Sequence, residues 1–368
     1  MTDSDPKPHK RRARYSGTHP KAYSQKYKEK HPDKFPELHE RLRAKGKTPA
    51  STHVPIMVEE VLGMLSPQPG EIVVDCTLGY GGHTYQFSKR LGPTGRIIGL
   101  DVDGDELDKT RERLTKIATP LTVYRKNYAG LASVLGEEKL PGVDIIFADV
   151  GVSSMQVDDP ARGISYKHKG PLDMRMDSRL KETGIDLLQK LSAEELSLAL
   201  KELSDEPDHN EIAKAIVAQR VSQPITQTGQ LIRLVFQVKR WTPKSWKEQQ
   251  KKRFNTLHPA ARTFQALRIL VNDELGSLTQ LLRIAPQCLN PGGRIGIISF
   301  HSGEDRLVKQ SFREGKATGL YELISGKPIT PRRKEIQENP RSSAAKFRYA
   351  KVSPESEVQS PEPSTFSL

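Results

Sequence analysis

Short apolar runs that alternate with helical patterns constrain this chain more than any other feature. Three of them end in an acid, at Asp75, Asp101 and Asp149. In chain order the runs are EIVVDCTLG, GRIIGLDVD, LTVYRKN, VDIIFADV, GGRIGIISF at 292–300 and FRYAKV at 347–352. Strands that alternate with helices are typical of a parallel sheet whose two faces are covered. The pattern therefore predicts an α/β fold with a parallel sheet.

A long interval without strands separates the fourth run from the fifth. A loop of that length does not belong in a compact domain. The interval instead holds segments with apolar residues at helical spacing: GIDLLQKLSAEELSLALKELS, EIAKAIVAQR and TGQLIRLVFQV. We therefore expect an all-helical subdomain at 161–257, inserted between the two parts of the α/β domain at 52–160 and 258–352. The chain should return through one long helix, HPAARTFQALRILVNDELGSLTQLLRIAPQCL.

The positive charge is concentrated at the N-terminus. The 368 residues include 58 Lys and Arg against 45 Asp and Glu, a net charge of +13, and residues 1–50 alone hold 14 against 6, a net of +8. We expect a disordered basic arm at 1–51 that neutralises nucleic-acid phosphates, with a solubilising tail as the alternative. The composition of residues 353–368, SPESEVQSPEPSTFSL, predicts a disordered acidic tail.

Several classes of protein are excluded by the composition. No run approaches 18 apolar residues, and the start MTDSDPKPHKRRAR lacks an apolar signal region, so we expect no membrane contact and a cytoplasmic location. Two cysteines, Cys76 and Cys288, cannot form a disulfide framework or a cysteine-rich zinc site. The segment DVDGDELDKTRE resembles a calcium loop, but Glu106 stands where that loop needs glycine. We expect no metal site.

The segment DCTLGYGGHT predicts a ligand-binding turn between a strand and a helix. Glycines there let the backbone approach a ligand closely. Thr84 replaces the third small residue of the dinucleotide fingerprint, and no Gly-Lys-Ser/Thr follows, so NAD and P-loop ligands fit poorly. Asp75 before the glycines suits an ammonium group, and Asp101 after the second strand suits ribose hydroxyls. Together they favour S-adenosylmethionine.

Five longer blocks occur in a fixed order: HVPIMVEEV, DCTLGYGGHT, FADVGVSSMQVDDPARGISYKHKGPLDMRMD, HPAARTFQALRILVNDEL and SFHSGEDRLVK. They closely resemble the bacterial ribosomal RNA small-subunit methyltransferase H family, also called MraW, over about residues 52–352. The resemblance implies a Rossmann-like, S-adenosylmethionine-dependent methyltransferase with an inserted helical subdomain. It also implies methylation of the N(4) amine of a cytidine in 16S rRNA at the decoding centre. The partner would be small-subunit rRNA or the assembled small subunit, and a homodimer is left open.

The resemblance carries seven cofactor contacts over to this chain: Gly81, Gly82, His83, Asp101, Tyr128, Asp149 and Gln156. Tyr128 stands where the family usually has Phe and would stack on adenine. The chain departs from the family at Met155, usually Pro, at Gly303, usually Leu, and in SDEPDHNEIAKAI, where a Gly-Glu-Glu-Arg string is common. The last departure concerns substrate handling more than the cofactor site.

The chemistry of the proposed target also limits the choice of residues. A cytosine amine is a poor nucleophile because its lone pair is delocalised, so a nearby hydrogen-bond acceptor and an in-line approach would help. Asp149 is the candidate acceptor, although the resemblance makes it a cofactor contact first. Methylation at a ring carbon would need a cysteine nucleophile, and neither Cys76 nor Cys288 lies on the strand-end segment ADVGVSS. Amine methylation is therefore favoured.

Four further polar residues are candidate substrate contacts: His258, Arg262, His301 and Ser302. Helix capping or ion pairing is an equally open interpretation for these positions. Four others can order the crossover into the helical insertion, without an assigned role: Arg162, Asp173, Arg175 and Asp177. Two rival functions also remain open at this point: methylation of another RNA base or of protein, and a non-catalytic ribosome-binding factor.

Overall fold

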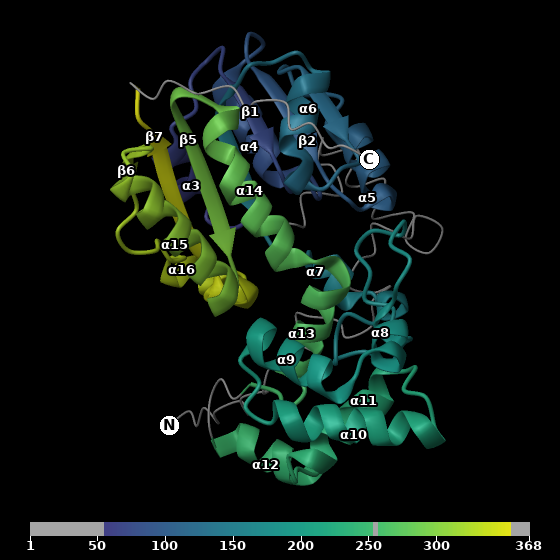
Figure 1. The fold of residues 1–368 in the computed structure, drawn as a ribbon. Coiled ribbons are helices and arrows are strands. Elements are labelled where there is room, and N and C mark those ends of the chain that lie inside the picture. The colour runs from purple at the N-terminus through teal and green to yellow at the C-terminus, as the bar shows by residue number, and fades with distance from the viewer. Residues whose placement is uncertain (1–54, 253–256, 355–368) are drawn as a thin grey trace, which may run out of the picture. The chain divides into compact units, whose positions relative to one another are not determined.

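The computed structural model describes residues 55–252 and 257–354, so the expected arm at 1–51 and the expected tail from residue 355 onward lie outside the described residues. The strands are β1 (Ile72–Asp75), β2 (Arg96–Leu100), β3 (Leu121–Tyr124), β4 (Val143–Asp149), β5 (Leu289–Ser299), β6 (Tyr321–Ile324) and β7 (Lys346–Val352). They form one sheet in the order β3-β2-β1-β4-β5-β7-β6 (Figure 1). The order 3-2-1-4-5 is that of a doubly wound sheet, so the α/β domain is Rossmann-like.

The helices alternate with the strands and also fill the interval between β4 and β5. They are α3 (Val58–Leu65), α4 (Gly82–Leu91), α5 (Gly104–Arg113), α6 (Leu131–Glu137), α7 (Ser154–Asp158), α8 (Gly184–Lys190), α9 (Ala193–Ser204), α10 (His209–Ser222), α11 (Thr228–Val238), α12 (Pro243–Lys252), α13 (Ala261–Asn272), α14 (Glu274–Cys288), α15 (Ser302–Ala317) and α16 (Arg333–Glu338). The described residues also form three short 3₁₀ segments, η3 (Tyr128–Gly130), η4 (Pro160–Arg162) and η5 (Pro340–Ala344). Within the described ranges, none of these helices has the length and apolar character needed to span a bilayer.

One edge of the sheet, formed by β7 and β6, differs from the sequence prediction. Strands β1 to β5 pair in parallel, whereas β7 pairs antiparallel with both β5 and β6. The prediction of a parallel sheet is therefore wrong at this edge, where an antiparallel addition to a parallel sheet is common. Strand β6 was not predicted from the sequence.

Each central strand sends alternate side chains to opposite faces of the sheet, as the period of two requires. Val73, Ile97 and Phe147 lie in the core formed with α3 and α4. Val74 and Ile98 lie in the core formed with α6, α14 and α15. Because both faces are covered, only the ends of the strands are left to bind a ligand.

The inserted helices have a hydrophobic core of their own. Leu188 of α8, Leu200 of α9, Ile216 of α10 and Leu231 of α11 belong to it, together with Phe264 of α13. The sequence predicts an insertion that ends at residue 257, whereas in the structure α13, which begins at Ala261, belongs to this helical core. The helical core thus continues into the segment that returns to the sheet.

The returning segment is not the single long helix that its periodicity predicts. It breaks at Asp273, which has left-handed angles (φ 47°, ψ 47°) between α13 and α14 (Figure 1). Helix α13 packs in the helical core, whereas α14 packs against the sheet. The side chain of Asn272 fixes the break by accepting from the amide of Met176 (2.7 Å) and donating to the carbonyl of Met174 (2.8 Å). The break lets one continuous segment serve two cores.

Candidate active site

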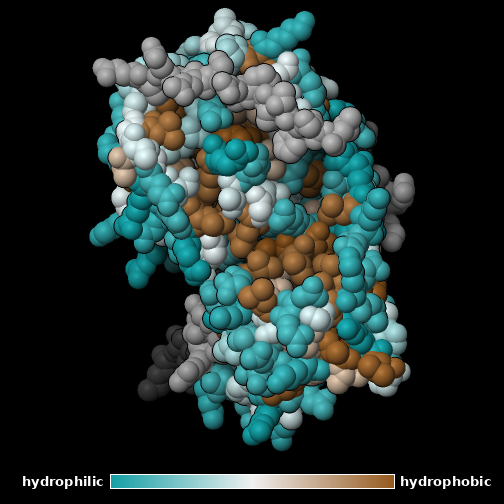
Figure 2. Space-filling view, in the orientation of Figure 1, coloured by the Kyte–Doolittle hydropathy of each residue, from teal (hydrophilic) through white to brown (hydrophobic). Residues whose placement is uncertain are grey.

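A cavity of about 730 Å³ lies at the carboxyl ends of β1, β2 and β4, with α13 as one wall. Figure 2 shows hydrophobic side chains gathered in a hollow in the middle of the surface that it displays. Seven of the predicted site residues line the cavity: Gly82, His83, Asp101, Tyr128, Asp149, Gln156 and His301. Four others do not line it: Gly81, His258, Arg262 and Ser302.

The glycine turn after β1 is fixed by contacts with the neighbouring elements. Gly81 has φ 75°, and a Cβ atom there would lie 2.6 Å from Cδ1 of Leu114, so this position requires glycine. The amide of Gly79 donates to Oδ2 of Asp101 (2.7 Å), and its carbonyl accepts from Oγ1 of Thr110 (2.6 Å). Gly81 therefore shapes the turn, while Gly82 reaches the cavity.

Asp101 is held in place by backbone amides at the end of β2. Besides the bond from Gly79, its Oδ1 accepts from the amide of Asp103 (2.9 Å). Burial raises the pKa of Asp101 to about 6, and the hydrogen bonds from these amides oppose the shift. A carboxylate has about four acceptor positions, so two remain for hydroxyl groups of a ligand. This arrangement can bind a diol such as ribose.

Asp75 does not line the cavity, although the sequence suggested that it would meet an ammonium group. Its carboxylate accepts from Oγ1 of Thr84 (2.7 Å) and from the amide of Thr77 (3.2 Å). Burial raises its pKa to about 6, and the bond from Thr84 opposes the shift. The role that the structure gives Asp75 is to join the glycine turn to the start of α4.

Asp149 ends β4 and presents an unsatisfied oxygen. Its amide donates to Oγ1 of Thr77 (2.7 Å), which fixes the backbone. Its Oδ1 is buried and has no hydrogen-bond partner among the described residues. Burial raises the pKa of Asp149 to about 8, and the negative charges of Asp75 and Glu304 add to the shift. A carboxylate with a buried, unpaired oxygen of this kind favours a cationic or hydrogen-donating ligand.

His83 stands beside Asp149 but does not neutralise it. Its Nδ1 lies 4.0 Å from Oδ2 of Asp149, and its Nε2 lies 2.9 Å from the carbonyl oxygen of Ile56. Burial lowers the pKa of His83 to about 4, so the imidazole is neutral near pH 7. His83 is therefore a polar wall of the cavity and adds no positive charge to it.

A half-buried charge on α13 and buried charges on α14 and α15 form another part of the cavity lining, which sequence reasoning missed. Arg268 binds Glu274 through two hydrogen bonds (2.8 and 3.0 Å). Oε2 of Glu304 accepts from the amide of Phe300 (2.7 Å), and Oε1 lies 3.1 Å from Nε2 of His301. A charged residue in an apolar helical pattern, such as Arg268 in FQALRILV, is the signal that could have found this cluster.

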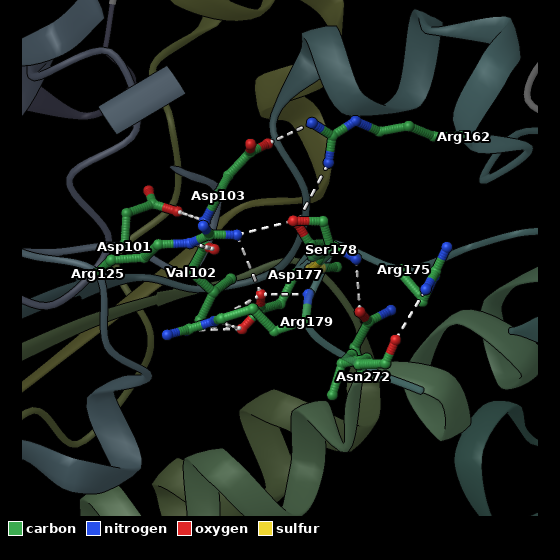
Figure 3. A network of polar contacts seen from close by, with 12 residues as sticks. Asp101, Val102, Asp103, Arg125, Arg162, Arg175, Asp177, Ser178, Arg179 and Asn272 are labelled. Atoms are coloured by element: carbon green, nitrogen blue, oxygen red, sulfur yellow. Dashed lines mark hydrogen bonds and ion pairs between the residues drawn. The ribbon is translucent and has the colours of Figure 1, made fainter. Parts of the chain in front are cut away.

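A polar network connects the end of β2 to the helical core (Figure 3). Gln156 donates through Nε2 to Oδ2 of Asp103 (3.0 Å), and Nη2 of Arg162 lies 2.8 Å from the same oxygen. Nη1 of Arg162 donates to the carbonyl of Met176 (3.2 Å), whose amide donates to Asn272 on α13 (2.7 Å). Gln156 thus contacts Asp103, and Arg162, which had no assigned role, joins the cavity to the crossover.

The three remaining substrate candidates make contacts within the protein. The ring of His258 stacks on Tyr166, with centroids 4.3 Å apart and planes at 8°. Arg262 donates to the carbonyl of Asp205, and Oγ of Ser302 donates to the carboxylate of the same residue (3.3 Å). Tyr166 itself lines the cavity. These contacts fit the structural interpretation that the sequence left open for the three positions.

The sequence matches the family model of the MraW methylase family over residues 50–353. A ribosomal RNA small subunit methyltransferase H 1 of Lachnoclostridium phytofermentans is 42% identical over 353 residues, 95% of this chain and 94% of the relative. A ribosomal RNA small subunit methyltransferase H of Koribacter versatilis is 39% identical over 306 residues, 81% and 93% of the two chains. A solved rRNA methylase of Streptococcus thermophilus superposes over 81% of this chain and 95% of its own, with 10% identity and a TM-score of 0.36. On the family match and the two sequence relatives, the chain belongs to the MraW methylase family.

Proposed function

We propose that this protein transfers a methyl group from S-adenosylmethionine to the N(4) amine of one cytidine in small-subunit (16S) rRNA, at the decoding centre. The names of the relatives support the coarser part, methylation of small-subunit rRNA. The single observation that carries the proposal is the buried, unpaired Oδ1 of Asp149 in the same cavity as the amide-held carboxylate of Asp101. These two acids fit a ligand that has both a cationic group and a diol.

The cavity fits S-adenosylmethionine in charge as well as in hydrogen bonding. When bound, this cofactor supplies a methyl group on a positively charged sulfur. Glu304 provides negative charge, Asp149 adds to it once a nearby cation favours its ionised form, and Asp101 has free acceptor positions for the ribose hydroxyls. Tyr128, half-buried on η3 after β3, offers a ring for adenine, and Gly82 lets the backbone come close. We assign the cofactor contacts to these residues together with His83 and Gln156, with Gly81 shaping the turn.

Asp149 has two roles in the proposal, which differ in their partner. It can bind the cationic part of the cofactor, and it can accept a hydrogen bond from the target amine. A positive charge nearby favours the ionised form of the carboxyl, and so lowers its pKa from about 8. An ionised Asp149 would then turn the lone pair of the amine towards the methyl carbon. The rigid end of β4 would hold the amine nitrogen in line with that carbon.

The state of the two thiols favours methylation of an amine over methylation of a ring carbon. Cys76 lines the cavity, but burial and the nearby Asp75 raise the pKa of its thiol well above the usual range. Cys288 is buried in the same core, and burial raises its pKa to about 11. Because the thiolate is the reactive form, neither group is a prepared nucleophile.

Residues of the helical core, among them Tyr166 and Phe264, also line the cavity, and we assign to the helical subdomain the admission of rRNA. His301 is the predicted substrate residue that lines the cavity, so it is our candidate for contact with the target cytidine. The test is mass mapping of small-subunit rRNA from cells with and without the gene. Loss of one N(4)-methylated cytidine, restored by the wild-type gene, is expected. An unchanged map, or loss of a methyl group from another base, would contradict the proposal.

A further inference from the structure

The helical subdomain carries a high positive charge on the end of α11, on α12 and on the turn that joins them. Residues 233–252 hold seven Lys and Arg against one acid, Glu248, which is a net charge of +6. Because the whole chain has +13 and residues 1–50 have +8, the remaining residues together carry only +5. This one segment therefore accounts for the entire positive excess outside the basic arm.

Six of these seven cations are exposed, and we call them the α11–α12 basic surface: Arg233, Arg240, Lys244, Lys247, Lys251 and Lys252. The seventh, Lys239, pairs with Glu206 at 2.6 Å and Asp208 at 3.7 Å. Among the described residues, none of the other six has an ion pair. They are therefore available to an external anion without the loss of an internal partner.

The packing of α12 fixes the direction of its lysines. Trp246 is buried and meets the ring of His258 edge-on, with centroids 5.8 Å apart. Lys244, Lys247 and Lys251 follow the spacing i, i+3, i+7 and so form one stripe, on the side of the helix away from Trp246. The tryptophan anchors the helix, and the lysine stripe faces solvent.

The α11–α12 basic surface is connected to the cavity through a short series of contacts. Tyr166 lines the cavity and stacks on His258, which in turn contacts Trp246 of α12. Along α13, one face lines the cavity from Ala261 to Asn272, a length of about 16 Å at 1.5 Å per residue. The cavity wall thus extends from the ends of the strands to the N-terminal end of α13, which follows His258 in the chain.

We propose that the α11–α12 basic surface binds the phosphate backbone of the rRNA segment that flanks the target nucleotide. The inference rests on the proposed function and adds where the substrate is held. Exposed Lys and Arg that neutralise phosphates release counterions, and such contacts position RNA without reading its sequence. The flanking backbone would lie on α12, while the target base enters the cavity along α13.

The test compares two triple variants of the full-length chain, K244Q/K247Q/K251Q and a control that removes the same charge from exposed positions of the α/β domain, K89Q/R90Q/K116Q. The probe is transcribed 16S rRNA, whose dissociation constant is measured over a salt series. Each lost phosphate contact with a single strand lowers the slope of log K against log salt by about 0.7. The slope of the α12 variant, which loses three such contacts, should therefore fall by about 2. Its affinity for S-adenosylmethionine should stay unchanged, and the control should keep the wild-type slope.

Equal slopes for wild type and the α12 variant, or an equal loss in the control, would overturn this inference. A second variant on α11 and the turn after it, R233Q/R240Q, should lose about 1 from the slope and covers the case in which the first fails to fold. Binding is measured without turnover, so it decides this inference alone. Failure of the wild type to methylate small-subunit rRNA would instead overturn the proposed function.

Discussion

Nη2 of Arg162 lies 2.8 Å from Oδ2 of Asp103, two residues beyond the acid that we assign to the ribose. The amide of Asp103 donates to Oδ1 of Asp101 (Figure 3). Asp103 therefore contacts Arg162 through its side chain and Asp101 through its backbone. On its other side, Arg162 donates to the carbonyl of Met176 in the crossover. The position of the ribose acid therefore depends on a residue from the segment that leads into the helical subdomain.

Replacement of Arg162 should weaken cofactor binding without removing any cofactor contact. Arg162→Gln should raise the dissociation constant for S-adenosylmethionine roughly tenfold, since a hydrogen bond to a charged group contributes about 1.5–3 kcal/mol and Gln156 still holds Asp103. Asp101→Ala, which removes the carboxylate itself, should raise this dissociation constant at least as much. Calorimetry on folded protein measures both, with the exposed Arg179→Gln as the control. An unchanged constant in Arg162→Gln would show that Asp101 does not depend on this network.

Asp149 should make the stability of the ligand-free protein depend on pH. Its pKa is about 8 in the folded protein and near 3.9 when unfolded, so between these values the folded state binds a proton that the unfolded state has released. The stability contributed by Asp149 is then complete below pH 4 and is lost as pH rises to 8. As pH rises across this window, the free energy of unfolding of Asp149→Asn should increase relative to that of wild type, by up to about 1.4 kcal/mol per pH unit.

Urea unfolding of both proteins at pH 5, 6.5 and 8 measures this difference. Asp108→Asn, at an exposed position on α5, is the control and should show no such trend. Saturating S-adenosylmethionine should reduce the effect, because a cation beside Asp149 favours its ionised form. A difference between Asp149→Asn and wild type that is constant with pH would contradict the raised pKa.

Neither cysteine should be needed for methyl transfer. The variant C76A/C288A should lose about 1–3 kcal/mol of stability, because both side chains are buried in one core. It should still transfer methyl groups at a rate within a few-fold of wild type, since the amine attacks directly. The rate is measured with labelled cofactor below the unfolding temperature of the variant. Complete loss of turnover, with fold and cofactor affinity intact, would revive the carbon-methylation mechanism.

The basic arm lies outside the described residues, and its role stays a prediction from sequence. Deletion of residues 1–50 should raise the Michaelis constant for small subunits much more than it changes the cofactor affinity, because several phosphate contacts are lost. The effect should shrink as salt rises, since exposed contacts are screened. Steady-state methylation by both proteins over a salt series measures it. A solubilising tail predicts identical salt slopes for the two.

The periodicity of the sequence predicted the parts of the fold in which one pattern governs one element. The central strands were found because apolar runs end in acids at the sheet edge. The break at Asp273 was missed because an Asn-Asp-Glu sequence does not interrupt a helical pattern, and the left-handed angles at Asp273 follow from packing α13 and α14 in different cores. A local pattern carries no information about such a division.

The residues of the candidate site that directly follow strands were predicted from the sequence. The residues that only tertiary contacts bring to the cavity were missed. Asp101 and Asp149 line the cavity because strand ends meet at one edge. Arg268 and Glu274 line it only because the helix breaks between them, which the sequence pattern did not indicate. Arg262 carries a charge suited to RNA, but in the structure that charge contacts a carbonyl of the α9 end.

The product formed on the ribosomal subunit decides whether this chain methylates the amine of a cytidine. Small subunits from cells that lack the enzyme are incubated with purified protein and methyl-labelled S-adenosylmethionine, and the rRNA is digested to nucleosides for mass spectrometry. We predict one labelled species, N(4)-methylcytidine, at about one per subunit with wild type and strongly reduced with Asp149→Ala. Label in 5-methylcytidine, in another base or in ribosomal protein, or no label above background, would contradict the claim.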